Sequence, residues 1–152
     1  MRGYCGIGIV AGKTPDNLGG LWRSAHAFGA DFIFTVGARY PDRGQATDTT
    51  EAWKHVPFFE YDSPAEFAAA IPRGCQVVGV ECDEDLAPRN LVSFHHPERS
   101  VYLLGAEDRG LSPAAVNLCR ELVQIPTAYC LNVATAGSIV LYDRAQKMGV
   151  AA

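Results

Sequence analysis

Short apolar segments without charged residues alternate along this chain with segments of helical periodicity, and this alternation restricts the fold more than any other feature. The apolar segments cover residues 6–10, 32–36, 76–80, 101–104 and 122–125. Strands that are buried on both faces of a parallel sheet have this nearly continuous apolar character. The helical segments lie between and after them, at residues 17–28, 63–70, 112–118 and 132–148. The sequence therefore predicts an α/β fold, a mostly parallel sheet covered by helices on both faces.

The composition is that of an ordinary soluble globular domain. The chain has 152 residues, a hydrophobic fraction of 48% and a formal net charge of −4. No internal repeat or linker is visible, so residues 1–152 are expected to form a single domain. No apolar run approaches the roughly 18 residues that a membrane helix needs, and the N-terminus turns polar at Lys13, too early for a signal peptide. We therefore expect a cytoplasmic protein without a membrane partner.

Charge and cysteine content restrict the partners further. The sequence has no Lys/Arg run, the general signature of nucleic-acid binding, so any such binding must come from a local patch. There are five cysteines, and no two are spaced as a Cys-x-x-Cys pair. An odd number without such spacing fits neither a zinc site nor a disulfide framework. We therefore expect reduced, mostly buried thiols at Cys5, Cys75, Cys82, Cys119 and Cys130.

Spacing argues against three familiar kinds of site. Gly12-Lys13-Thr14 resembles the end of a phosphate loop, but the glycines before it leave three or five intervening residues where four are needed. No G-x-G-x-x-G sequence follows a predicted strand, so a dinucleotide is not expected. Adjacent His95 and His96 would point in different directions in a strand or a helix. They are expected to be loop or surface histidines that do not share a metal ion.

Three loops leave the carboxyl ends of predicted strands, at residues 11–17, 105–111 and 125–132. Ligand sites in parallel α/β sheets lie at that edge of the sheet. The first loop leads into a helix that we expect Asp16 or Asn17 to cap. The functional site is therefore predicted where these three loops meet.

The helix after the first loop carries an arginine and two glycines. Gly19, Arg23 and His26 are predicted to share one face, and Gly20 follows Gly19 directly. Two glycines in a first helical turn cost about 1 kcal/mol each. That cost is explained if a substrate backbone must approach closely, with Arg23 one turn further along the helix. A surface arginine beside a flexible turn is an equally good interpretation.

The other two loops carry a carboxylate and a helix of small residues. Gly105 can turn backbone groups towards a ligand, and Glu107 can orient a hydroxyl or a guanidinium, although a solvated tight turn fits the same residues. The third loop leads into residues 132–148, which are apolar nearly all round in the first half of the helix. Because this helix can pack on its own sheet with one side only, its other side is expected to contact a second copy. We therefore predict a homodimer.

These loops carry three motifs in order, and with them the sequence resembles the SpoU (TrmH-like) family of SPOUT RNA methyltransferases. The motif N-x-G-x-x-x-R lies at residues 17–23, and L-x-G-x-E-x-x-G-[LM] lies at residues 103–111. The third motif, an Ile-Pro pair followed by Ser-Leu-Asn-Val, lies at residues 125–133. Cys130 stands where the family usually has Ser, and a thiol is a poorer hydrogen-bond partner than a hydroxyl.

The resemblance implies a fold, a cofactor and a reaction. The C-terminal segment of the family fold is threaded into a deep trefoil knot, which periodicity could not reveal. The cofactor is S-adenosylmethionine, bound in the knot without a metal ion, and the product is a 2′-O-methylated ribose in RNA. The positions that would contact the cofactor, mostly through backbone groups, are Val80, Glu81, Gly105, Ile125, Cys130 and Leu131.

The same resemblance assigns the catalytic and RNA-binding residues. Arg23 would serve the ribose hydroxyl, with Glu107 and Asn132 fixing the catalytic site. Asn17, Gly19 and Arg23 would bind the RNA substrate.

The family works as dimers with the site near the interface, here through the C-terminal helix and residues 17–28. Short members of the family that lack an added RNA-binding domain often modify tRNA. Because no such domain or basic segment is visible here, the resemblance implies tRNA rather than rRNA as the substrate. A catalytically weak RNA-binding or dimerisation module of the same fold is the alternative.

Overall fold

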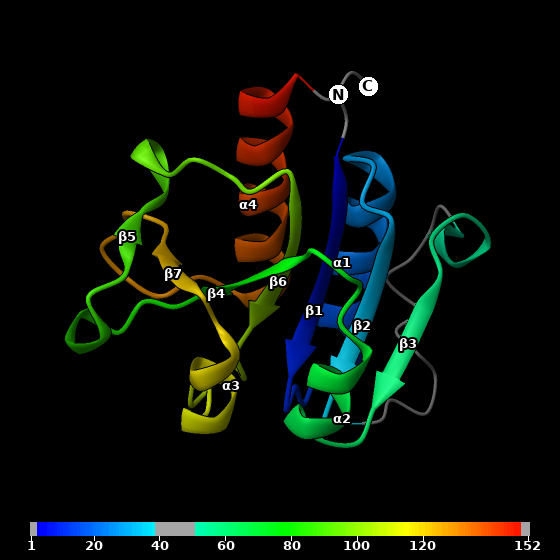
Figure 1. Cartoon of the computed structure of the whole chain (residues 1–152), viewed down its shortest axis with the longest axis horizontal. Coiled ribbons are helices and arrows are strands. Elements are labelled where there is room, and N and C mark those ends of the chain that lie inside the picture. Colours follow the sequence, from blue (N-terminus) through cyan, green and yellow to red (C-terminus); the bar gives the residue numbers. More distant parts are fainter. Residues whose placement is uncertain (1–2, 39–50, 150–152) are drawn as a thin grey trace.

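The computed structural model describes residues 3–38 and 51–149. Within them, seven strands form one sheet in the order β3-β2-β1-β6-β4-β7-β5, and every neighbouring pair is parallel (Figure 1). The strands are β1 (Tyr4–Val10), β2 (Phe32–Val36), β3 (Phe58–Tyr61), β4 (Gln76–Val80), β5 (Arg89–Asn90), β6 (Arg99–Leu104) and β7 (Glu121–Gln124). The helices are α1 (Pro15–Ala27), α2 (Pro64–Ala70), α3 (Pro113–Leu118) and α4 (Val133–Met148). Short 3-10 turns are η1 (Ala52–Lys54), η2 (Glu84–Leu86) and η3 (Leu91–Ser93).

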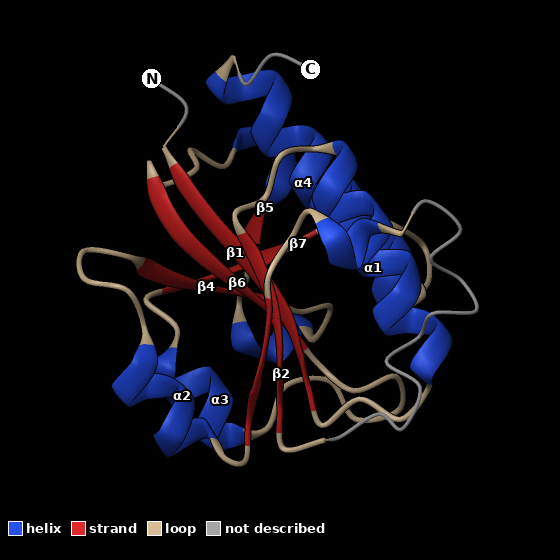
Figure 2. Ribbon diagram, turned by 90° about the vertical axis from the view of Figure 1, so that its right-hand side faces the viewer, coloured by secondary structure: helices blue, strands red, loops and turns tan. Residues whose placement is uncertain are grey.

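Two pairs of helices cover the two faces of the sheet (Figure 2). Helix α1 packs against α4 on one face, and α2 packs against α3 on the other. The core beneath α1 and α4 includes Ile7 and Leu104, and the core beneath α2 and α3 includes Phe34 and Leu103. The predicted α/β class, a parallel sheet with both faces covered, is confirmed. None of the described helices is long and apolar enough to cross a membrane.

Every predicted strand and helix is present, with ends within two residues of the expected positions. Strands β3 and β5 were not predicted. Both lie at edges of the sheet. The two residues of β5 are exposed, and no residue of β3 is fully buried. Neither strand therefore carries the continuous apolar pattern by which the interior strands are found.

Alternate glycines in β1 explain how two aromatic rings fit beside this strand. Gly6 pairs with Phe32 and Gly8 with Phe34 in the parallel register. A Cβ atom at either glycine would lie less than 3.0 Å from the paired phenyl ring, and at Gly8 also from the Phe34 carbonyl oxygen. The intervening Ile7 belongs to the core on the opposite face. The Gly-Ile-Gly sequence thus makes room for rings on one face of β1 while it fills the other face.

Helix α1 begins differently from the prediction. Thr14 is the N-cap residue and Pro15 is the first helical residue, a position that suits proline because an N–H there has no partner within the helix. The predicted cap at Asp16 or Asn17 is therefore wrong. The Asn17 side chain is buried instead and bonds to another loop.

His95 and His96 lie in different environments. His95 is exposed, whereas the His96 ring is fully buried, with Nδ1 2.6 Å from the Tyr102 hydroxyl and Nε2 2.7 Å from the Asp143 carboxylate. Asp143 also pairs with Lys147 at 2.8 Å, and the ammonium of Lys147 donates to carbonyl oxygens of the η3 region. Both histidines lie in the loop between η3 and β6, as expected, but the side chain of His96 is buried rather than at the surface, and it joins α4 to β6.

Gly8→Ala is expected to destabilise the protein by about 1–3 kcal/mol, because the added methyl group would overpack the contact between β1 and the Phe34 ring. Urea denaturation measures the change in the free energy of unfolding. Gln146→Ala, at an exposed position of α4, is the control and should change this free energy by less than about 0.5 kcal/mol. Equal stability of the two variants would show that position 8 does not need a glycine for space.

Burial lowers the pKa of His96, although the Asp143 carboxylate acts in the opposite direction. A histidine whose pKa is lower in the folded protein takes up its proton preferentially in the unfolded chain. The free energy of unfolding should therefore be highest above about pH 6.5, the ordinary histidine pKa, and fall as the pH drops below it.

Thermal denaturation between about pH 7.5 and about pH 5.5 tests this dependence. We expect His96→Gln to lose less stability over this range than the wild-type protein. His95→Gln, which removes the exposed neighbour, should keep the wild-type profile. A His96→Gln profile parallel to that of the wild type would refute the expected role of His96.

Candidate active site

A pocket of about 300 Å³ opens at the carboxyl ends of β6, β4 and β7, which lie side by side in the sheet. Its wall comes from residues within 80–86, 104–111 and 125–133, with Ala136 of α4. The six positions at which the sequence predicted cofactor contacts all lie in this wall. They are Val80, Glu81, Gly105, Ile125, Cys130 and Leu131.

Glu81, the residue after β4, holds two segments of the wall together. It is only 9% exposed. Its Oε1 accepts a hydrogen bond from the Cys82 N–H at 2.8 Å, and its Oε2 accepts one from the Leu111 N–H at 2.9 Å. The N–H of Asp83 donates a longer bond of 3.3 Å to Oε1. These donors satisfy a carboxylate whose burial would otherwise be costly. Glu81 therefore fastens the loop after β6 to the end of β4.

The loop after β6 is tightly closed. Ala106 and Gly110 exchange backbone hydrogen bonds of 3.2 and 3.0 Å, and Gly110 has a left-handed φ of 65°. A Cβ atom at Gly105 would lie less than 3.0 Å from the backbone of Gly110 and Leu111, and one at Gly110 less than 3.0 Å from Oε2 of Glu81. Gly105 does line the pocket, as expected from the sequence. Both glycines are also required by the fold of the loop itself.

Side chains from the three motif loops meet in one hydrogen-bonded chain. The Asn17 amide donates to Oε1 of Glu107 at 2.7 Å, and the Asn132 amide donates to Oδ1 of Asn17 at 2.8 Å. Asn132 also caps α4, because its Oδ1 accepts the Thr135 N–H at 3.2 Å. The backbone N–H of Lys13 donates a longer bond of 3.3 Å to Glu107. Residues 17, 107 and 132 are therefore adjacent in space, although they lie far apart in the sequence.

Arg23 lies on the exposed face of α1 and does not line the pocket. Helix α1 contains Gly19, Arg23 and His26, so their spacing places them on one face, but Gly19 is buried whereas Arg23 and His26 are exposed. At Gly20, a Cβ atom would be 3.3 Å from the Cβ atom of Ala134 in α4. Gly20 thus has a packing reason for its small size, because it allows α1 and α4 to pack closely. The approach of a substrate backbone to the paired glycines stays a prediction.

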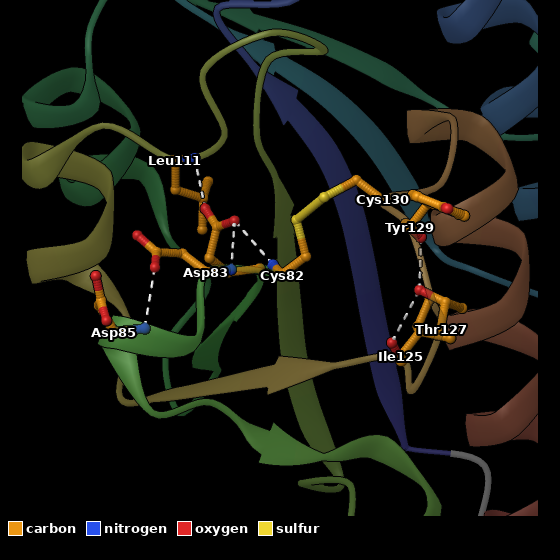
Figure 3. The surroundings of a disulfide bond; sticks show 9 residues. Cys82, Asp83, Asp85, Leu111, Ile125, Thr127, Tyr129 and Cys130 are labelled. Atoms are coloured by element: carbon orange, nitrogen blue, oxygen red, sulfur yellow. Dashed lines mark hydrogen bonds between the residues drawn. A yellow bond between two sulfur atoms is a disulfide. The ribbon is translucent and has the colours of Figure 1, made fainter.

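The cysteines depart from the prediction, because Cys82 and Cys130 form a disulfide (Figure 3). The expectation of reduced thiols is wrong for this pair. A sequence separation of 48 residues gives no sign of the bond, but β4 and β7 are neighbours, so the segments that follow them leave the same edge of the sheet. Cys5, Cys75 and Cys119 are free, and burial raises the pKa of Cys5 and of Cys119 to about 12.

The pocket wall also contains residues that were not among the predicted site residues. They include Cys82, Asp83, Leu86, Asp108, Arg109 and Thr127. Asp108, Arg109 and Thr127 lie in the predicted loops, and for Cys82 and Asp83 the available signal was their place two and three residues after the end of β4. The Lys13 ammonium donates to Asp108 at 2.6 Å and holds the pKa of this exposed carboxyl below its usual value, so Asp108 lies at the rim as part of an ion pair. No group of three or more His, Cys, Asp or Glu side chains among the described residues is arranged to hold a metal ion.

A family model described as the SpoU rRNA Methylase family matches residues 7–142 of this chain. The chain belongs to the SpoU family. The match runs from β1 into α4 and so includes the whole pocket.

Two relatives show the range of enzymes in which this SpoU domain occurs. The 23S rRNA (uridine(2479)-2′-O)-methyltransferase of Streptomyces viridochromogenes is 30% identical over 149 residues, which are 92% of this chain and 52% of the relative. The tRNA (guanosine(18)-2′-O)-methyltransferase TARBP1 of Mus musculus is 30% identical over 148 residues, 90% of this chain and 9% of the relative. The chain thus spans about half of the first relative and a small part of the second.

Solved structures agree on the SpoU fold. The SpoU methyltransferase AviRb from Streptomyces viridochromogenes, in complex with AdoMet, superposes with a TM-score of 0.86 at 24% identity, covering 100% of this chain and 60% of that one. A structure described as giving insights into the 2-OH methylation of C/U34 on tRNA superposes with a TM-score of 0.82 at 24% identity, covering 99% of this chain and 100% of that one. At this identity the likeness concerns the fold alone. The knotted threading of the C-terminal segment stays a prediction.

Within this SpoU pocket, Glu81→Gln is expected to lower the free energy of unfolding by about 1–3 kcal/mol, because the amide nitrogen would replace one carboxylate oxygen and face an N–H donor. Hydrogen exchange at the Leu111 N–H should become faster, since this group would lose its acceptor. Glu84→Gln, at an exposed position of η2, is the matched control and should leave both measurements unchanged. If exchange at Leu111 and the stability were both unchanged in Glu81→Gln, Glu81 would not fasten this loop.

Proposed function

We propose that this SpoU-family chain transfers a methyl group from S-adenosylmethionine to a ribose 2′-hydroxyl of RNA. The main support is the hydrogen-bonded chain of Asn17, Glu107 and Asn132, which unites the three motif loops beside one pocket. Relatives named as RNA 2′-O-methyltransferases are similar over about nine-tenths of the sequence, 92% and 90%.

The pocket suits S-adenosylmethionine in size and in chemistry. Its volume of about 300 Å³ is at the lower end of the range for small-molecule sites. Val80, Leu104 and Ile125 give it an apolar wall for an adenine ring. The cofactor, when bound, supplies an electrophilic methyl group. The residues that would hold it are Val80, Glu81, Gly105, Ile125, Cys130 and Leu131.

Asn17, Glu107 and Asn132 are proposed to act by positioning. Asn17 is 6% exposed and uses its amide on Glu107 and its oxygen on Asn132, so its orientation is determined at both ends. Asn132 is fixed in turn as the N-cap of α4. Such fixed geometry matters because orientation alone can lower a reaction barrier by about 7–11 kcal/mol.

Arg23 is proposed to hold an RNA phosphate and to stabilise the alkoxide that develops on the 2′-oxygen. A neutral arginine lies roughly 7 kcal/mol above the charged form at pH 7, so the proton of the ribose hydroxyl would pass to a phosphate or to water instead. Arg23 lies outside the pocket wall of its own chain. The proposal therefore includes a homodimer through α1 and α4, in which Arg23 acts at a site completed by two copies. The 52% exposed Tyr142 of α4 would become covered in such a dimer.

For the substrate we favour tRNA, with residues 1–152 acting as one methyltransferase domain. The structure described for C/U34 methylation on tRNA is covered over 100% of its length by this chain. A second candidate is rRNA, favoured by the 30% identity to the 23S rRNA methyltransferase.

The proposed activity is tested with the purified protein, S-adenosylmethionine labelled in its methyl group, and separate tRNA and rRNA fractions. Digestion of the RNA to nucleosides should recover the label as a 2′-O-methylated nucleoside from tRNA. Label in rRNA alone would select the second candidate, and label on a base would contradict ribose methylation. Cofactor and RNA binding without any transfer would indicate the catalytically weak module.

Arg23→Lys is expected to reduce kcat about a hundredfold, because a lysine lacks the forked donor set that holds a phosphate and a developing oxyanion together. The affinity for S-adenosylhomocysteine should stay within about twofold, since Arg23 does not line the pocket. Arg73→Lys is the control for general effects of the exchange. Arg73 lies in the exposed turn before β4, at the amino end of that strand and so away from the carboxyl ends that form the pocket. Near-normal turnover of Arg23→Lys would show that the reaction does not need an arginine at position 23.

A further inference from the structure

The Cys82–Cys130 disulfide joins two segments of the pocket wall that come from different strands (Figure 3). Cys82 lies just beyond the end of β4, and Cys130 lies in the segment between β7 and α4. Their Cα atoms are 6.2 Å apart, within the usual range for a disulfide. Because both residues line the pocket, the bond is itself part of the wall.

The two ends of this disulfide are held differently. On the β4 side, the buried Glu81 carboxylate accepts the Cys82 N–H at 2.8 Å. On the other side, residues 126–131 are exposed. Within the described residues, the hydrogen bonds of this segment run from the Thr127 hydroxyl to carbonyl groups of the segment and of the residue before it. The disulfide therefore adds a covalent link from an anchored residue to an exposed segment.

Both residues of the pair are exposed, and the other cysteines are less accessible and less reactive. The thiolate is the species that attacks a disulfide. Burial raises the pKa of Cys5 and Cys119 to about 12 and also raises the pKa of Cys75, so these thiols stay protonated at neutral pH. A small reagent would therefore react at the exposed pair.

We propose that Cys82 and Cys130 form a reversible modification site, with a low-molecular-weight disulfide as the oxidant and a low-molecular-weight thiol as the reductant. One cysteine thiolate attacks the small disulfide, which forms a mixed disulfide and releases one small thiolate. The second cysteine thiolate then attacks the protein sulfur of the mixed disulfide, which forms the Cys82–Cys130 bond and releases the second small thiolate. The protein loses two electrons and two protons, and these convert one small disulfide into two thiols. Reduction follows the reverse sequence.

The consequence of this modification rests on the proposed function, because it concerns the pocket assigned to S-adenosylmethionine. In the oxidised form, the segment at residues 126–131 is tied to the end of β4 before any ligand arrives. In the reduced form, the ligand must order that segment, and ordering reduces affinity. Leu131 of the pocket wall and Asn132 of the motif chain follow Cys130 directly. The oxidised protein is therefore the form that binds the cofactor more tightly.

The modification itself is tested on the full chain, oxidised with glutathione disulfide or reduced with a phosphine. Titration with a thiol reagent after denaturation should find three free thiols in the oxidised protein, Cys5, Cys75 and Cys119, and five in the reduced protein. Peptide mapping after alkylation should assign the bond to Cys82 and Cys130. Five free thiols after oxidation, or a bond between other cysteines, would overturn the proposed site.

The effect of oxidation on cofactor affinity is tested by calorimetric titration of the oxidised and reduced proteins with S-adenosylhomocysteine. We expect the oxidised protein to bind about fivefold more tightly than the reduced protein. Cys130→Ser should bind like the reduced wild type under both conditions, whereas Cys75→Ser, which keeps the pair intact, should retain the response to oxidation.

The outcomes separate this inference from the proposed function. Equal affinities of the oxidised and reduced proteins, or tighter binding by the reduced one, would overturn the effect on the pocket. Loss of binding in both forms would contradict the proposed cofactor, and the thiol count would still decide the modification site.

Discussion

Parallel pairing of β6, β4 and β7 is the constraint on which the rest of this structure depends. Parallel strands end at a common edge, so three segments that are distant in the sequence leave the sheet side by side. The central position of β4 places Glu81 within hydrogen-bonding distance of the loop after β6. The same position places Cys82 within bonding distance of the segment after β7. A different strand order would leave the same residues without a common pocket.

The sequence predicted the interior of the fold well, because burial on both faces leaves a pattern that is easy to recognise. The helices predicted from residues 63 and 112 begin at capping serines, since Ser63 accepts the Glu66 N–H and Ser112 accepts the Ala115 N–H. Edge strands were missed, since half-buried strands carry no continuous apolar run. Contacts between distant segments were missed for a different reason. The burial of His96 and the pairing of the cysteines depend on which elements become neighbours, and local pattern contains no information on that.

The candidate site was predicted by position rather than by role. The loops at the strand ends were located correctly, and the six cofactor positions carried over from the family resemblance lie in the pocket wall, whereas Arg23 does not. Gly20, at an unspecified position of the first motif, lies against Ala134, so its small size has a role in helix packing that the sequence did not indicate. Asn17 was expected to cap α1, but it lies in the first turn of α1 and its side chain bridges two other motif residues. A motif residue can therefore hold a site together through contacts with other motif residues.

Gly6 and Gly8 of β1, which leave space for aromatic rings, restrict how related sequences can diverge. The ring of the paired β2 residue occupies the space beside each glycine. Phe32 fills the space beside Gly6, and Phe34 fills the space beside Gly8. A bulkier residue on β1 is tolerable only where the facing aromatic residue has become smaller. Compensating exchanges at these two pairs would reveal the alignment of the first two strands in a relative of unknown structure.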